Sequence, residues 1–169
     1  MDNNVLKKLS YGMYAVSTLD GNRHVGCIAN SIMQVTHDII AVSINHENYT
    51  NICLNKTRKF AVSILGENIE NNVIAFLGFQ SGRDRDKFKN IGCIQKNGLC
   101  VVKSAVGYLI CEIVDKVETE THTVFLARIT DGEILNEEPP MSYSYYHKVR
   151  KGKSPKTAPT YQDDSEGHA

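Results

Sequence analysis

Small and amide-bearing residues gather between Gly26 and Thr36, in a stretch that otherwise has the pattern of a half-buried strand. Glycine and alanine in a strand let a flat ligand approach the backbone closely. Short amide and hydroxyl side chains can fix the orientation of such a ligand in an apolar slot. A barrel strand with its polar residues outward shows the same alternation, so both interpretations stay open. The candidate binding residues here are Ala29, Asn30, Ser31, Gln34, Val35 and Thr36.

A second candidate stretch runs from Ser43 to Asn51, where a predicted strand leads into the start of a predicted helix. Unpaired backbone N–H groups at a helix N-terminus attract anions and carbonyl oxygens. Capping the helix requires only one polar side chain, and this stretch offers several. A ligand site and simple capping therefore remain alternatives. The candidates are Ser43, Asn45, Asn48, Thr50 and Asn51.

The polar loop from Phe79 to Phe88 is a candidate phosphate site. A hydroxyl, a flexible glycine and two cations close in sequence could hold a phosphate through charge-assisted hydrogen bonds. The acidic residues Asp84 and Asp86 alternate with the cations, so a solvated loop of mutually neutralised charges is the alternative. The candidates are Ser81, Gly82, Arg83 and Lys87.

His122 is the one histidine placed where it could take part in catalysis, directly before a predicted strand. An imidazole titrates near neutral pH and could handle a proton or hydrogen-bond a ligand, although a purely structural histidine fits the same position. No spacing of histidines with cysteines or carboxylates indicates a metal site. The five cysteines include no Cys-x-x-Cys pair, which excludes a rubredoxin iron site or a zinc ribbon on this sequence. We expect reduced, half-buried thiols, although Cys93 and Cys100 could approach each other in a hairpin.

The elements that must position these residues are mainly β-strands. The residue pattern predicts strands over 14–19, 24–36, 39–44, 60–65, 101–102, 108–117 and 123–129, and short helices over 49–56 and 68–77. Many short strands at regular spacing indicate a closed or nearly closed antiparallel barrel. The prediction is one mainly β domain over residues 1–161, a split barrel with short flanking helices. Residues 162–169 are predicted to be a disordered tail.

The composition of the chain argues against two classes of binding partner, nucleic acid and membranes. Nineteen basic residues balance nineteen acidic ones in the 169-residue chain, so no overall field favours nucleic acid or an anionic membrane. No apolar stretch approaches the ~20 residues that a membrane helix needs. The N-terminus lacks the pattern of a secretion signal, which predicts a cytoplasmic protein.

In their order and spacing these segments resemble the flavin reductase-like, FMN-binding split-barrel family, over roughly Val5 to Tyr161. The resemblance is carried by residues 28–36, 41–50, 60–64, 78–88 and 122–126. The branch it is most similar to is the flavin domain of high-molecular-weight rubredoxins and flavoredoxins, which the tail from Gly152 to Tyr161 fits.

The resemblance implies a homodimer with FMN at the subunit interface. The strand from Asn30 to Thr36 would flank the flavin ring, while Ser81, the basic loop and Lys56 would reach the phosphate. His122 would lie near the ring face or the nicotinamide entry as the catalytic candidate. Hydride from NAD(P)H would reach the flavin, and electrons would pass to free flavin or to a separate rubredoxin-like protein. The alternatives are a flavoredoxin-like carrier reduced by another protein, and a binder of another flavin or a haem-related ligand.

Overall fold

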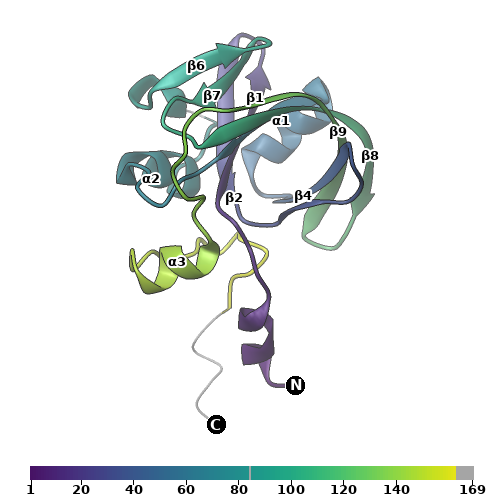
Figure 1. The fold of residues 1–169 in the computed structure, drawn as a ribbon. Coiled ribbons are helices and arrows are strands. Elements are labelled where there is room, and N and C mark those ends of the chain that lie inside the picture. The colour runs from purple at the N-terminus through teal and green to yellow at the C-terminus, as the bar shows by residue number, and fades with distance from the viewer. Residues whose placement is uncertain (84, 163–169) are drawn as a thin grey trace.

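The computed structural model describes residues 1–83 and 85–162, and its centre is one curled antiparallel sheet (Figure 1). The seven strands run in the order β2-β1-β5-β8-β9-β4-β3. Their bounds are β1 Tyr14–Asp20, β2 Arg23–Ala29, β3 Ile32–Gln34, β4 Ile39–Asn45, β5 Lys59–Ile64, β8 Gly107–Glu118 and β9 His122–Ile134. A separate hairpin consists of β6 Cys93–Lys96 and β7 Leu99–Val102. The predicted mainly β split barrel is confirmed.

The connection between β2 and β3 closes the barrel. These two strands lie at opposite edges of the sheet, yet only Asn30 and Ser31 join them. Two residues span no more than roughly 7 Å of extended chain. The sheet must therefore curl until its two edges meet, and the residues at the ends of β2 and β4 come together at that seam.

The prediction of one continuous strand over 24–36 is wrong. The chain leaves β1 at Ala29, crosses the seam, and pairs with β4 from Ile32 onward. The long alternating pattern hid this change of partner, because both halves keep the period of two that a strand requires.

Short helices cover one side of the barrel. The predicted first helix is confirmed as α1, Tyr49–Thr57, in which the side chain of Asn48 accepts a hydrogen bond from the backbone N–H of Thr50. The second, α2, runs over Asn71–Phe79 and buries Val73, Ile74 and Leu77 against the barrel. The structure adds two 3-10 helices, η1 Asn3–Lys8 and η2 Lys87–Asn90, and a C-terminal helix α3, Tyr143–Lys148.

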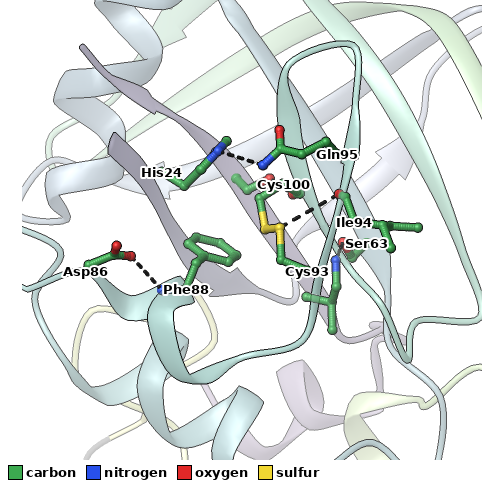
Figure 2. The surroundings of a disulfide bond; sticks show 10 residues. His24, Ser63, Asp86, Phe88, Cys93, Ile94, Gln95 and Cys100 are labelled. Carbon is green, nitrogen blue, oxygen red and sulfur yellow. Dashed lines mark hydrogen bonds between the residues drawn. A yellow bond between two sulfur atoms is a disulfide. The ribbon is translucent and has the colours of Figure 1, made fainter. Parts of the chain in front are cut away.

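The prediction of five reduced cysteines is wrong for one pair. Cys93 and Cys100 form a disulfide across the β6–β7 hairpin, with their Cα atoms 5.6 Å apart, within the range that a disulfide can bridge (Figure 2). Phe88 from η2 and His24 lie beside this bond, and His24 Nε2 is 2.9 Å from Gln95 Nε2. Cys27, Cys53 and Cys111 are free and buried.

The C-terminal part of the chain returns to the barrel after α3. Residues 152–160, which we call the strap, run back across the seam, and Thr160 accepts a hydrogen bond from the side chain of Asn30 (2.6 Å). Seven of the eight residues predicted to be a disordered tail, 163–169, lie outside the described residues. Within the described ranges, no helix is long and apolar enough to cross a membrane.

Candidate functional site

A pocket lies at the seam of the barrel, between the sheet, α2 and the strap. It encloses about 590 Å³ of empty space, including its open mouth. Its walls come from the end of β2, the end of β4, the start of α1, the face of α2, the aromatic rings of α3 and the strap. The lining residues used below are Ile28, Ala29, Asn30, Ser43, Asn45, Asn48, Gly78, Tyr143, Ser154 and Thr157.

The wall from β2 is built of small or amide side chains where the chain leaves the sheet. Ala29 is buried at the end of the strand, and Asn30, which is only 4% exposed, follows it. Asn30 Nδ2 donates to Thr160 in the strap, and Asn30 Oδ1 accepts from Ser31 Oγ (3.2 Å). A flat ligand can therefore lie against the backbone at this point without meeting a large side chain.

The end of β4 and the start of α1 form the opposite wall. Asn45 Oδ1 accepts from the backbone N–H of Glu47 (2.8 Å), and Asn48 Oδ1 accepts from the backbone N–H of Thr50 (3.1 Å). The same side chains shape the turn and line the pocket, so capping is confirmed for Asn48 and a ligand site here stays a prediction. The hydroxyl of Ser43 makes no hydrogen bond to the described residues and is available to a ligand.

His122 lies beside this wall, directly opposite Asn45 in the pairing of β4 with β9. Its Nδ1 lies 2.8 Å from Thr121 Oγ1, while its buried Nε2 has no hydrogen-bond partner of good geometry in the described part of the chain. Burial lowers the pKa of His122; the approaching backbone of Thr157 partly raises it, and neighbouring His46 lowers it further. The neutral imidazole is therefore favoured near neutral pH, and a ligand that donates a hydrogen bond could satisfy Nε2.

Lys87, at the end of the basic loop, is buried and does not line the pocket. Lys87 is only 4% exposed, and its ammonium donates to the carbonyls of Gly26 (2.9 Å) and Leu77 (3.2 Å). Burial lowers the pKa of Lys87, and the adjacent Cys27 partly raises it. Since its donors serve the backbone, Lys87 anchors η2 to the barrel in this structure.

Arg83 is placed differently, at the outer end of the same loop. Its guanidinium lies 4.9 Å from the centre of the Tyr49 ring, at the first residue of α1. Arg23 fixes the loop by donating to the carbonyl of Gly82 (2.7 Å) and that of Arg83 (3.1 Å). The backbone N–H of Arg83 donates to Ser81 Oγ (3.2 Å). Arg83 therefore contacts the side chain of the first residue of α1, and Ser81, Gly82 and Arg83 do not line the pocket.

Several predicted residues do not line this pocket. Gln34, Val35 and Thr36 are exposed, at and beyond the edge strand β3, and Lys56 is exposed near the far end of α1. Thr50 and Asn51 are buried inside the barrel, where Asn51 Nδ2 donates to the carbonyl of Ile44 and to Thr123 Oγ1, each at 3.0 Å. These two polar groups are satisfied within one chain, and their role is structural there.

The wall made by α3 and the strap was not predicted from the sequence. Tyr143 and Tyr146 of α3, and Lys153, Ser154, Pro155, Thr157, Ala158 and Pro159 of the strap, line the pocket. The change of composition after Pro139 was the available signal: a tyrosine cluster followed by a lysine- and proline-rich segment. Nothing in that pattern shows that the segment folds back across more than a hundred residues of sequence.

Comparison with known proteins agrees with this geometry. A family model described as "Flavin reductase like domain" matches residues 6–153. The chain is 37% identical over 165 residues to the high molecular weight rubredoxin of Moorella thermoacetica, covering 95% of this chain and 72% of that protein. It is 33% identical over 165 residues to a ferric-chelate reductase (NAD(P)H) of Archaeoglobus fulgidus, covering 95% and 98%.

Solved structures show the same fold. The NADH:FAD oxidoreductase SgcE6 of Streptomyces globisporus C-1027 has a TM-score of 0.74 at 20% identity, covering 81% of this chain and 83% of that one. Flavin reductase PheA2 has a TM-score of 0.71 at 25% identity, covering 82% and 88%. The chain thus has the curled-barrel fold of these solved structures. The chain belongs to the flavin reductase-like family.

The residues of the pocket fit a flavin. A volume of a few hundred Å³ between apolar walls, with a few polar groups, is typical of a cofactor site. Ala29 and Gly78 are small residues that line the pocket, and Ser43 offers an unused hydroxyl in its wall. His122 does not itself line the pocket; it lies opposite Asn45 in the β4–β9 pair, and its buried Nε2 has no hydrogen-bond partner of good geometry in the described part of the chain.

Proposed function

We propose that this chain is an NAD(P)H-dependent flavin oxidoreductase that holds FMN in the pocket at the seam. The proposal rests above all on that pocket, where small residues of β2, an unused hydroxyl of β4 and the start of α1 meet. The names of two relatives support it, because one is a ferric-chelate reductase (NAD(P)H) and the other a high molecular weight rubredoxin. Both names point to electrons passing onward to iron, directly or through a protein.

The roles of the chain's own residues follow from their positions. When bound, FMN would supply the ring that accepts and returns electrons. Ala29 and Asn30 would flank that ring, and Ser43 with Asn45 would contact its polar edge. Arg83 and the N–H groups at the start of α1 would hold the phosphate. His122 would orient the nicotinamide beside the ring.

A homodimer would complete the site. Met33 and Val35 on and beside the edge strand β3 are 63% and 48% exposed, unusually high for apolar side chains next to a cofactor site. A second copy laid against this edge would cover them. It would also bring Gln34 and Thr36, which do not line the pocket of their own chain, towards the pocket of the other.

The second candidate function is a flavoredoxin-like carrier that another protein reduces. The high molecular weight rubredoxin at 37% identity favours it, since that name describes electron transfer between protein centres. The two functions share the cofactor and differ only in the electron donor.

The identity of the electron donor distinguishes the two functions. We expect the FMN-loaded protein, mixed anaerobically with NADH or with NADPH, to lose its flavin absorption band at a rate on the order of 1–10³ s⁻¹. His122→Ala should be slower without being inactive, since it removes an orienting group and no bond-making one. Stopped-flow absorbance measures both. No bleaching with either nucleotide, together with ready reduction by dithionite, would identify the carrier instead.

Binding of the FMN phosphate gives a second test of the proposed function. Arg83→Ala should weaken FMN binding roughly ten- to hundredfold, because a charge-assisted hydrogen bond contributes about 1.5–3 kcal/mol. Riboflavin, which lacks the phosphate, should bind this variant and the unchanged protein equally well. Fluorescence titration with both flavins measures the ratio. The control is Arg85→Ala, an exposed cation of the same loop. Equal losses for FMN and riboflavin would show that Arg83 only shapes the loop.

A further inference from the structure

Three polar side chains form a continuous connection that starts in the pocket. Tyr143 Oη contacts Ser154 Oγ, and Ser154 Oγ lies 3.1 Å from His147 Nε2. The other ring nitrogen, His147 Nδ1, lies 2.9 Å from the carbonyl oxygen of Gly152. Tyr143 and Ser154 line the pocket, whereas His147 stands behind them and is partly exposed. The connection therefore leads out of the pocket to a histidine within reach of solvent.

The pocket end of this connection is the hydroxyl of Tyr143. Burial raises the pKa of Tyr143, while hydrogen bonding from the side chains of Thr160 and Asn30 lowers it in part. Both of those side chains belong to the seam, where Asn30 donates to Thr160. The Tyr143 hydroxyl thus joins the polar groups around the pocket to Ser154.

The hydrogen bonds along this connection can point in either direction, because each hydroxyl can both donate and accept. The carbonyl of Gly152 can only accept, so Nδ1 of His147 carries a proton. In the neutral imidazole, Nε2 then accepts from Ser154, and Ser154 accepts from Tyr143. In the imidazolium, Nε2 donates to Ser154, and both hydroxyls turn the other way. The two states differ only in where the protons lie. Release to solvent then requires the partly exposed ring of His147 to rotate, so that Nε2–H leaves Ser154 and gives its proton to water.

The packing of His147 holds this geometry. Its ring stands edge-on to that of Tyr143, with the ring centres 4.3 Å apart, and 5.3 Å from the centre of the Tyr146 ring. Tyr146 Oη donates to the carbonyl of Lys153 (3.1 Å), next to Ser154 in the strap. The helix and the strap therefore fix the relay atoms from two sides.

The proposed reaction produces a proton that must leave the pocket. With one-electron acceptors A, the balance is NAD(P)H + 2 A → NAD(P)⁺ + 2 A⁻ + H⁺, in which NAD(P)H is oxidised and each acceptor gains one electron. The acceptors take no proton. Reduction of the loaded protein by hydride transfer from NAD(P)H, in contrast, needs no proton from the protein. A path that carries this proton to solvent would therefore affect only the half of the cycle in which electrons pass to the acceptors.

We propose that Tyr143, Ser154 and His147 carry this proton from the pocket to solvent. The inference rests on the proposed function, and it assigns to α3 and the strap a role in the oxidative half of the cycle. Tyr143 is the group at the pocket, and Ser154 and His147 act through it.

The test follows both halves of the cycle in one stopped-flow series on the FMN-loaded full chain. Bleaching by NAD(P)H is recorded first, and then the return of the flavin band on mixing with ferricyanide. We expect His147→Gln, whose residue lies behind the pocket wall, to be bleached at the unchanged rate and reoxidised roughly ten- to hundredfold more slowly. Ser154 lines the pocket, so Ser154→Ala is compared with its own bleaching rate, relative to which its reoxidation should slow by a similar factor. Positioned acid–base groups contribute about 10²–10⁴-fold, and water at the open mouth replaces part of that. The matched control is Tyr145→Phe, which removes a hydroxyl from the same helix outside the relay.

Two further readouts separate proton transfer from a structural role. Imidazole added to the buffer should restore reoxidation of Ser154→Ala and His147→Gln, and a solvent deuterium isotope effect should accompany the slow step. In the flavin-free protein, ¹⁵N NMR should show neutral His147 protonated at Nδ1. Unchanged reoxidation in both variants, or slow reoxidation that imidazole does not restore, overturns the relay. Absence of bleaching by either nucleotide contradicts the proposed function itself.

Discussion

Replacing Ser43 by tryptophan is expected to lower the affinity for FMN at least about a hundredfold, which corresponds to about 2.7 kcal/mol. Ser43 is partly exposed at the end of β4, and its unused hydroxyl lies at the pocket wall. An indole at this position would occupy the slot that the small residues of β2 leave open. Because the new side chain projects into empty space, the barrel should stay folded. Fluorescence titration with FMN measures the affinity, and thermal unfolding checks the fold.

The matched control is Ser144→Trp, which places the same side chain at an exposed position of α3 that does not line the pocket. It should bind FMN as the unchanged protein does. If Ser43→Trp also binds FMN with unchanged affinity while folded, the flavin lies elsewhere, and the assignment of this pocket is wrong.

Ending the chain at Lys151 should weaken FMN binding roughly ten- to hundredfold, or about 1.4–2.7 kcal/mol. The truncation removes the whole strap, including a wall of the pocket and the hydrogen bond from Asn30 to Thr160. Asn30 would then present an unpaired buried amide to water or ligand. The bound flavin should also become more accessible, so that a soluble quencher such as iodide reduces its fluorescence more strongly.

A chain that ends at Gln162 is the control for this truncation. It keeps every strap residue that lines the pocket and should bind FMN normally. Equal affinity and equal quenching for the chains ending at Lys151 and Gln162 would show that the strap does not cover the flavin.

The local features of the site could be read from the sequence because they depend on neighbouring residues. Asn48 caps α1, as its position before the predicted helix indicated. The role of Lys87, in contrast, could not be predicted from neighbouring residues. Charge and spacing made it a phosphate ligand, but the fold buries its ammonium against the carbonyls of Gly26 and Leu77. A buried amine needs acceptors, and which acceptors reach it depends on packing.

What the sequence determined by itself was most of the strands, the two principal helices, the family and several polar residues that line the pocket. These follow from periodicity, capping and motif order, which act over a few residues at a time. Only the tertiary structure decided that Asn30 and Ser31 cross from one sheet edge to the other, that Cys93 bonds to Cys100, and that the strap closes the pocket. Each of these contacts depends on how the curled sheet places distant segments side by side. Local pattern carries no information about that placement, because the same alternation fits either edge of a sheet.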